Sequence, residues 1–415
     1  METINHILKS ASEATRVIKN ISASKKEEIL NDLANELLLH TDRIIAENLK
    51  DLAKMDDGNP KKDRLLLNAD RIKGLSDSLK EVAVLEDPTN KIISDRVLKN
   101  GLHVQKKTVP LGVVGVIYES RPNVTIDVAA LCIRSGNVCV LRGGSDAYHT
   151  NICLIDIIKS VLKRHQVDEN IVQLLPVERE FVAELLGATK YVDIIIPRGS
   201  QQLIDFVREN SKVPVIETGA GVCHTYVEET GDLDKAADII TNAKVTRPSV
   251  CNSLDSIVVD QKVASDLLKK VAPKLAAYNV EIFADDRSFK VLDEVGYSYL
   301  QHAKPEDFGR EFLDFKCSVK VVDSFDEAIN HITEHSSKHS EAIVSKDQGK
   351  IDRFMNDIDA AAVYSNASTR FTDGGEFGLG AEIGISTQKL HARGPFALEK
   401  LVTEKWFVTG DGQIR

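Results

Sequence analysis

Short apolar runs that alternate with helix-like runs constrain the fold of this chain more than any other feature. Between residues 110 and 216 the runs expected to form strands are Val113–Tyr118, Val138–Leu141, Val172–Leu175, Val192–Ile196 and Val213–Ile216. The segments between them have helical apolar spacing: Val124–Ile133, Thr150–Arg164, Arg179–Leu186 and Ser200–Glu209. Continuous apolar runs are typical of parallel strands that helices cover on both faces. We therefore predict a parallel α/β sheet in this region.

A second α/β pattern follows residue 251. The expected strands are Ser256–Val259, Glu281–Phe283, Ser318–Val322, Ala342–Val344 and Ala361–Tyr364, and the expected helices are Val263–Ala277, Phe325–His335 and Asp347–Ile358. Residues 1–90 have helical spacing almost throughout. With 415 residues, the chain is long enough for two or three domains.

The segment Asp95–Thr108 is typical of a β-hairpin that turns at Asn100-Gly101, a dipeptide that suits a type I′ turn. The hairpin has no evident core of its own, so it is either an arm for subunit contact or a plain surface hairpin. A late strand is expected at Leu401–Val408, and we predict that it pairs with a partner molecule.

Charge and cysteine usage limit the class of protein. The net charge is −10 without a dominant basic block, which argues against nucleic acid as a partner. The six cysteines are scattered without a CxxC pair, which argues against a disulfide framework or a zinc site and fits a reducing cytoplasm. No run approaches the roughly 18 apolar residues that a membrane span needs, so no membrane association is expected.

Polar and glycine residues follow several predicted strands. Arg142-Gly143-Gly144-Ser145 and Arg198-Gly199-Ser200 each lie between a strand and a helix, where backbone N–H groups and a guanidinium can hold an anion. Arg142 would suit an adenosine 2′-phosphate, because the guanidinium matches phosphate geometry. Neither segment has the GxGxxG or P-loop spacing, so an ordinary strand-to-helix turn explains each one equally well.

Cys251 is the candidate nucleophile. It lies in the polar loop Arg247–Ser253, between a helix-like run at Leu233–Lys244 and a strand-like run. Arg247 would favour the thiolate, and the Cys251 N–H with the Asn252 amide would stabilise an oxyanion. The alternative is a small buried hydrophobic residue, which cysteine often is.

Three histidines, His331, His335 and His339, are spaced four apart. This spacing suggests either a metal site or surface histidines. Because HExxH is absent, we predict no metal, and because GxSxG is absent, we do not expect a serine hydrolase.

Six blocks in the same order resemble the γ-glutamyl phosphate reductase family, within the aldehyde dehydrogenase superfamily. The blocks are Pro110–Asn123 (PLGVVGVIYESRPN), Leu141–Ala147 (LRGGSDA), Arg247–Ser253 (RPSVCNS), Ala328–Ile343, Asn366–Thr387 and Gln388–Leu398. The resemblance covers essentially the whole chain. It implies a Rossmann-type NADPH-binding domain at 1–90 and 110–222, an α/β catalytic domain at 223–385, and a β-arm for oligomerisation at 91–109 and 386–415.

The resemblance also implies an activity, which is the NADPH-dependent reduction of L-glutamyl 5-phosphate to L-glutamate 5-semialdehyde. Phosphate would be released through a cysteine thioester, in the second step of proline biosynthesis from glutamate. The expected partners are the small-molecule substrate, further copies of the chain, and a glutamate 5-kinase. The alternatives are an aldehyde-oxidising dehydrogenase and a nucleotide-binding regulator without enzyme activity.

Carried over residue by residue, the resemblance makes Cys251 the catalytic thiol. Glu217 matches the glutamate that activates water in aldehyde-oxidising relatives, 251 − 217 = 34 residues earlier. The oxyanion amide would come from Asn123 or Asn252, and a small shift in alignment places Glu119 there instead of Asn123. The residues expected to hold NADPH are Arg142, Gly143, Ser145, Gly199, Ser200, Gly219 and Glu311. The residues expected to hold the substrate are Arg247, Asn252, Ser368 and Arg370.

Overall fold

The computed structural model describes residues 3–56 and 61–415, which form two compact units. Unit 1 comprises Met1–Thr218, Gly378–Gly384 and Leu390–Arg415, and unit 2 comprises Gly219–Phe377 and Ile385–Lys389. Each unit contains one of the two predicted parallel sheets. The assignment of cofactor binding and catalysis to separate segments stays a prediction.

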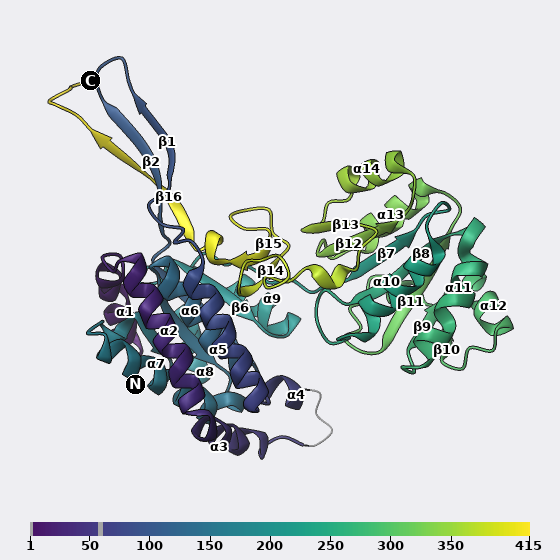
Figure 1. The fold of residues 1–415 in the computed structure, drawn as a ribbon, viewed down its shortest axis with the longest axis horizontal. Helices are drawn as coiled ribbons and strands as arrows, with labels where there is room; N and C mark the ends of the chain where they lie inside the picture. The colour runs from purple at the N-terminus through teal and green to yellow at the C-terminus, as the bar shows by residue number, and fades with distance from the viewer. Residues whose placement is uncertain (1–2, 57–60) are drawn as a thin grey trace. The chain divides into compact units, whose positions relative to one another are not determined.

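The N-terminal region of unit 1 is helical, as predicted. Its helices are α1 (Asn5–Ile18), α2 (Ala23–Leu39), α3 (Thr41–Leu52), α4 (Lys61–Leu65) and α5 (Ala69–Val84) (Figure 1). Ser22 and Asn68 begin α2 and α5 by accepting hydrogen bonds from backbone N–H groups of the first turn. The apolar faces of α1, α2, α3 and α5 share one hydrophobic core with the unit 1 sheet, and Leu65 of α4 packs in a small separate cluster.

The sheet of unit 1 has four parallel strands in the order β5-β4-β3-β6. The strands are β3 (Val113–Tyr118), β4 (Val138–Gly143), β5 (Val172–Leu174) and β6 (Ile194–Arg198). The connecting helices are α6 (Asn123–Ser135), α7 (Tyr148–Arg164), α8 (Arg179–Leu186) and α9 (Gln201–Asn210). The predicted strand Val213–Ile216 is wrong, because only Val215 makes a bridge, to Ile195. Pro214 lacks the N–H that a ladder requires.

The sheet of unit 2 has seven parallel strands in the order β10-β9-β11-β8-β7-β12-β13. The strands are β7 (Cys223–Val227), β8 (Leu254–Asp260), β9 (Glu281–Ala284), β10 (Leu300–His302), β11 (Lys316–Val322), β12 (Ser340–Val344) and β13 (Ala362–Ser365). Its helices are α10 (Leu233–Val245), α11 (Gln261–Ala276), α12 (Asp286–Glu294), α13 (Phe325–His335) and α14 (Gln348–Asp357). Helices α10, α11 and α12 share one core with the sheet, and α13 and α14 share a second core.

Three antiparallel strands extend away from the helices of unit 1 (Figure 1), in the order β1 (Ile92–Val97), β2 (His103–Pro110) and β16 (Val402–Thr409). The late strand β16 pairs with β2 of its own chain and forms one edge of this sheet, so its pairing with a partner molecule stays a prediction. The predicted type I′ turn is wrong. Gly101 has φ +86°, but Asn100 is not left-handed, and Gly101 N donates to Leu98 O at 2.9 Å. A further strand pair consists of β14 (Glu382–Ser386) and β15 (Gly394–Ala397).

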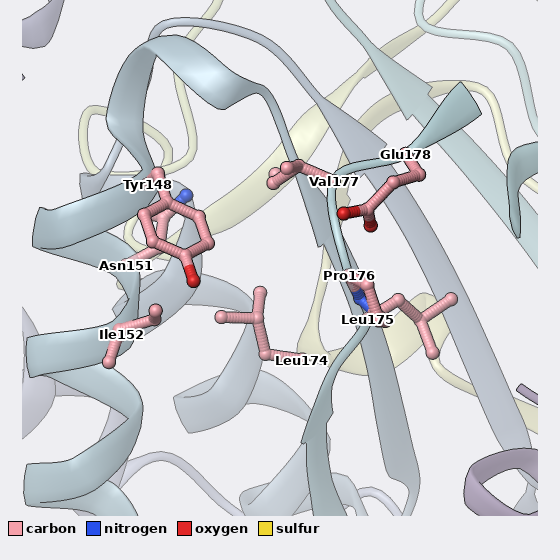
Figure 2. Close-up of a pocket in the computed structure, with 9 residues that line it drawn as sticks. Tyr148, Asn151, Ile152, Leu174, Leu175, Pro176, Val177 and Glu178 are labelled. Atoms are coloured by element: carbon pink, nitrogen blue, oxygen red, sulfur yellow. The ribbon is translucent and has the colours of Figure 1, made fainter. Parts of the chain in front are cut away.

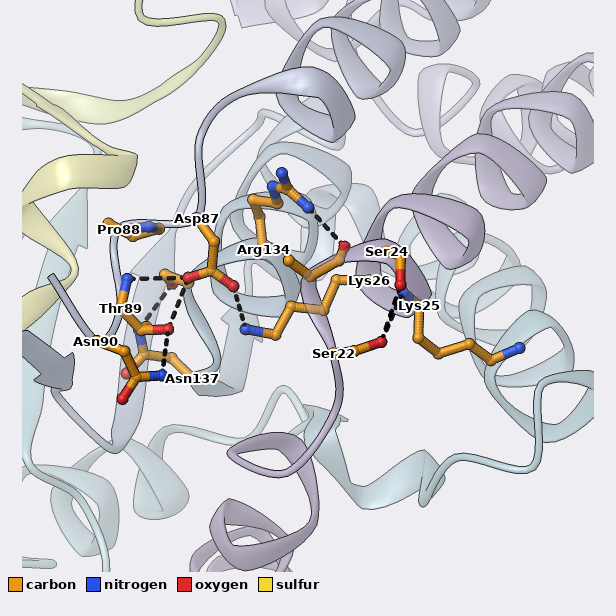
Figure 3. A network of polar contacts seen from close by, with 12 residues as sticks. Ser22, Ser24, Lys25, Lys26, Asp87, Pro88, Thr89, Asn90, Arg134 and Asn137 are labelled. Carbon is orange, nitrogen blue, oxygen red and sulfur yellow. Dashed lines mark hydrogen bonds and ion pairs between the residues drawn. The ribbon is translucent and has the colours of Figure 1, made fainter.

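A buried polar network holds the segment that enters β1 (Figure 3). Lys26 of α2 forms an ion pair with Asp87 at 2.8 Å, and the Lys26 side chain is 3% exposed. Arg134 of α6 donates to the backbone oxygen of Leu85. Asn137 donates at 2.7 Å to the backbone oxygen that precedes β16. The two outer strands, β1 and β16, are thus both anchored to the helical layer at the same end of the sheet.

No helix within residues 3–56 and 61–415 is both long enough and apolar enough to cross a membrane.

Candidate functional site

Cys251 lies in the turn between α10 and β8, at the amino end of β8. It is partly exposed, whereas the other five cysteines are buried. A nucleophilic thiol has to reach its substrate, and a buried one cannot. Burial accordingly raises the pKa of Cys223 and Cys317 above the ordinary range. The alternative of a small buried hydrophobic residue therefore fits those cysteines and not Cys251.

The backbone of Cys251 is packed directly against Gly221. A Cβ atom on Gly221 would lie 1.6 Å from the Cys251 oxygen, so only glycine fits there. The N–H of Gly221 donates to Glu311 Oε1 at 2.8 Å, and Cys223 Sγ donates to the Cys251 oxygen at 3.2 Å. Glu311, predicted to bind the nicotinamide ribose, thus lies within reach of the nucleophile loop.

The side chain of Asn252 is buried and fully engaged. Its amide nitrogen donates to the backbone oxygens of Arg370 at 3.2 Å and Thr372 at 3.0 Å, and its amide oxygen accepts from Arg370 Nη1. An amide has two N–H donors, and both are used here. Both side-chain N–H groups of Asn252 are therefore engaged within the protein, and the predicted role of this amide toward an oxyanion or substrate stays a prediction.

Two arginines lie near the nucleophile in unit 2. Burial lowers the pKa of Arg370 and the neighbouring Arg247 lowers it further, whereas Asp373 and Cys251 act in the opposite direction. Ser368 Oγ accepts from the Arg370 N–H at 3.3 Å. Arg370 Nε is buried and has no hydrogen-bond partner in the described part of the chain. The structure therefore brings Cys251, Arg247, Ser368 and Arg370 together in unit 2.

In unit 1 a cavity of about 240 Å³ opens beside the carboxyl end of β4. Figure 2 shows Tyr148, Asn151 and Ile152 of α7 across the cavity from the segment Leu174–Glu178. Arg142 is half-buried at this end and donates to the Val177 oxygen, while its Nε has no partner in the described residues. Burial lowers the pKa of Arg142, and nearby acidic side chains partly offset this.

Gly143 and Ser145 follow Arg142, and the structure distinguishes their roles. A Cβ on Gly143 would lie 2.2 Å from Asn151 Nδ2 and 3.2 Å from the Tyr118 ring. The glycine is therefore required for packing beneath the cavity. Ser145 is exposed at the start of a short 3-10 helix (Ser145–Ala147).

The amino end of α9 already holds a carboxylate. The N–H of Ser200 donates to Glu119 Oε2 at 3.2 Å, and a Cβ on Gly199 would lie 2.8 Å from the same oxygen. Helix N-termini attract anions, and the resemblance predicted a pyrophosphate here. Sequence reasoning did not predict that Glu119 would occupy this position. It also missed Ser120, which is buried with φ +46°, a conformation that non-glycine residues seldom adopt.

Asn123 and Glu217 both belong to unit 1 and both have partners there. Asn123 Nδ2 donates to Asp127 at 3.0 Å, and burial raises the pKa of Asp127 to about 7. Arg208 of α9 donates to Glu217 at 3.3 Å. Gly219 begins unit 2, and a Cβ there would lie 2.9 Å from Thr387 Oγ1. The catalytic roles predicted for Asn123 and Glu217 stay predictions.

The three histidines do not form one cluster on a helix. The rings of His331 and His335 on α13 are tilted by 52° with centroids 4.6 Å apart, and His339 follows outside the helix, which ends at His335. His331 and His339 are buried, so the alternative of surface histidines is wrong for both. Burial lowers the pKa of His331 to about 3. Across the described ranges, no group of three or more His, Cys, Asp or Glu side chains is arranged to hold a metal ion.

Comparison with known proteins places this geometry in context. A model of the aldehyde dehydrogenase family matches residues 1–289. A gamma-glutamyl phosphate reductase of Chlorobaculum parvum is 51% identical over 415 residues, covering 100% of this chain and 99% of that protein. One from Legionella pneumophila strain Paris is 51% identical over 409 residues and covers 98% of each chain.

A solved structure supports the same relationship. The crystal structure of a gamma-glutamyl phosphate reductase from Thermotoga maritima matches with a TM-score of 0.93 and 38% identity, covering 100% of both chains. The two parallel α/β sheets predicted from the apolar runs are therefore those of a known architecture, and the predicted fold class is confirmed.

Proposed function

The chain belongs to the aldehyde dehydrogenase family, among the γ-glutamyl phosphate reductases, and we propose that Cys251 is the thiol on which it reduces L-glutamyl 5-phosphate to L-glutamate 5-semialdehyde. This is the second step of proline biosynthesis from glutamate. The observation that carries the proposal is Cys251 itself, a partly exposed thiol near Arg247 and the partly buried Arg370.

Cys251 attacks the acyl carbon of the acyl phosphate. The sulfur forms a thioester as the C–O bond to phosphate breaks, and inorganic phosphate leaves with the bonding electron pair. The Cys251 N–H is one donor for the oxyanion that develops on the acyl oxygen. The predicted second donor is Asn123, which is held by Asp127 in unit 1.

Arg370 and Arg247 receive the leaving phosphate. The buried Arg370 Nε has no partner among the described residues, and an arginine with an unused N–H edge matches two phosphate oxygens. Ser368 Oγ accepts a hydrogen bond from the backbone N–H of Arg370, and this contact fixes the shape of the turn. Positive charge at this point stabilises phosphate as it accumulates charge on leaving.

The family uses nicotinamide cofactors, and the residues of unit 1 fit one. The cavity beside β4 is mostly apolar in its lining, as an adenine ring requires, and Arg142 carries an unpartnered buried Nε at its edge. Arg142 would hold the 2′-phosphate, and Gly199 and Ser200 the pyrophosphate in place of the Glu119 carboxylate that Ser200 N–H now contacts. Glu311, which belongs to unit 2, would hold the nicotinamide ribose. These roles, and the preference for NADPH, are part of the proposal. When bound, NADPH supplies the hydride that reduces the thioester carbon.

Further parts of the proposal concern partners. The exposed three-stranded sheet is the proposed oligomerisation arm, a glutamate 5-kinase is the proposed source of the substrate, and the cytoplasm is the proposed location. The competing function is an aldehyde-oxidising dehydrogenase with Glu217 as the base. Glu217 accepts a hydrogen bond from Arg208, which holds it in unit 1. A nucleotide-binding regulator is the alternative without catalysis.

The decisive experiment runs the reaction backwards, with glutamate semialdehyde, NADP⁺ and phosphate. We expect NADP⁺ reduction that requires phosphate or arsenate and that is lost in Cys251→Ser. The matched control is Cys317→Ala, which alters a buried thiol of the same unit and is expected to retain turnover. Phosphate-independent reduction would indicate aldehyde oxidation instead. Full turnover by Cys251→Ser would show that the nucleophile is another group.

A further inference from the structure

Asn252 joins the nucleophile loop to a distant turn. Besides its amide contacts to Arg370 and Thr372, its backbone oxygen accepts from Thr369 Oγ1 at 2.8 Å. Asn252 and Thr369 are buried. Because Asn252 is bonded covalently to Cys251, any movement of the turn would be transmitted to the sulfur.

The turn is also fixed on its other side. Thr372 Oγ1 is hydrogen-bonded to Ser340 Oγ at 2.6 Å and to Tyr364 OH at 2.7 Å. These partners belong to β12 and β13 of the unit 2 sheet. The turn therefore rests on two strands of the sheet, and Asn252 lies between this support and Cys251.

The contact with Asn252 also orients the Arg370 guanidinium. Asn252 Oδ1 accepts from Nη1, which lies on the edge opposite to Nε–H. The remaining edge presents Nε–H and one N–H of Nη2 side by side, which is the pair that binds two oxygens of a phosphate. Nε is buried and has no hydrogen-bond partner among the described residues.

From these contacts we propose that Asn252 is a positioning residue that holds the phosphate-binding edge of Arg370 in a fixed relation to the Cys251 sulfur. Asn252 touches neither the acyl group nor the phosphate. It fixes the position of the leaving phosphate relative to the attacking sulfur. This position matters because a misplacement of the reacting atoms by about 1 Å can lower the rate about 100-fold. This inference rests on the proposed function and names the residue that organises its phosphate site.

The test measures phosphate binding in two ways, on the full chain. The first is protection of Cys251 from iodoacetamide by inorganic phosphate, followed by mass spectrometry of the Cys251 peptide. The second is the KM for phosphate in the reverse reaction. We expect Asn252→Ala to raise both phosphate constants about tenfold, as the loss of one charge-assisted hydrogen bond would, while the KM for NADP⁺ stays within about twofold. A merely structural loss would alter both KM values together.

A double-mutant cycle sharpens the result. Arg370→Ala is expected to weaken the binding of phosphate strongly. Adding Asn252→Ala should weaken this binding no further, because Asn252 acts on phosphate only through Arg370. The proposal would be overturned if the double variant raised the phosphate constants by the product of the two single effects. It would also be overturned if phosphate protected Cys251 of the Asn252→Ala protein as well as it protects the wild type. Ser253→Ala is the control, because it removes a hydrogen bond from the same loop to Ala243 and leaves the turn intact.

A milder variant covers the case in which Asn252→Ala does not fold. Thr369→Val removes only the hydrogen bond to the Asn252 backbone oxygen. We expect a two- to threefold rise in the phosphate constants. Phosphate constants equal to those of the wild type would overturn the proposal. The protection assay needs no turnover. A wild-type protein that reduces NADP⁺ without phosphate would refute the proposed function, whereas the role of Asn252 is decided by whether phosphate protects Cys251.

Discussion

Gly221 and Cys251 meet backbone to backbone: a Cβ atom on Gly221 would lie 1.6 Å from the oxygen and 2.7 Å from the Cα of Cys251. No side-chain rotation relieves such an overlap, because both atoms of Cys251 belong to its main chain. The position of the nucleophile thus depends on the absence of a side chain thirty residues earlier in the chain (251 − 221 = 30).

Gly221→Ala is therefore expected to displace the Cys251 turn and to lower kcat about 100-fold or more. The rate of Cys251 alkylation by iodoacetamide should change as well, since the thiol moves with its backbone. Gly74→Ala is the control, because Gly74 is exposed in α5 and no atom lies within 4 Å of the added Cβ. That helical change should keep activity and stabilise the protein by about 0.5–1 kcal/mol. A Gly221→Ala enzyme with normal kcat would contradict the packing argument.

Arg142→Ala tests the cofactor preference. A guanidinium on the 2′-phosphate contributes about 1.5–3 kcal/mol, so the Kd for NADPH should rise about 10- to 100-fold. NADH lacks that phosphate, so its Kd should rise much less. Some rise is expected because Arg142 also supports the cavity wall through its hydrogen bond to the Val177 oxygen. Fluorescence titration with both cofactors gives the ratio of the Kd for NADH to the Kd for NADPH. Arg142→Lys should recover part of the preference for NADPH that Arg142→Ala loses. Equal weakening of NADPH and NADH would reject the 2′-phosphate role.

The local pattern of apolar runs predicted most of the fold. The strands β3, β4, β8 and β11 were found at the expected places because their residues are buried on both faces. The run Val213–Ile216 has the same composition but contains Pro214, and one missing N–H was enough to leave it outside the ladder. A count of apolar residues does not reveal that a backbone hydrogen-bond donor is missing at Pro214.

The site was predictable only in part, because its hydrogen bonds join residues that are far apart in sequence. Cys251 and Arg370 were found from their chemistry and the family resemblance. Asn252 and Arg370 are 118 residues apart, and no local pattern reveals that the Asn252 amide is consumed by this turn. Glu119 at the amino end of α9 was missed for the same reason, since it lies 81 residues from Ser200.

The Lys26–Asp87 pair at the base of the three-stranded sheet gives a stability prediction. Removing one partner of a buried pair costs about 3–5 kcal/mol, because the other charge stays buried without compensation. Lys26→Met and Asp87→Asn should each lower the thermal midpoint strongly, and the double variant should lose less than the sum. Exposed Lys73→Met beside Asp77 is the control and should leave the thermal midpoint almost unchanged. Additive losses would show that the two charges do not compensate each other.

The last prediction concerns pH, and it follows from Asp127. Burial raises the pKa of this carboxyl to about 7, the hydrogen bond from Asn123 lowers it, Glu382 raises it and Arg198 lowers it. The unfolded chain releases the proton near pH 3.8. Between these two values the folded protein keeps a proton that the unfolded chain has lost, so the folded state is penalised increasingly as pH rises to about 7, and fully above it.

Asp127→Asn removes this penalty, because an amide does not ionise and its oxygen can still accept from Asn123. One pKa unit corresponds to about 1.4 kcal/mol, so the stability advantage of the variant over the wild type should grow by about 2–3 kcal/mol between pH 5 and pH 8. Thermal unfolding at both pH values measures the difference, with Asp77→Asn, an exposed carboxylate, as the control. Other groups that titrate in both proteins cancel in the comparison. An advantage that is the same at pH 5 and pH 8 would mean that Asp127 is already ionised at pH 5.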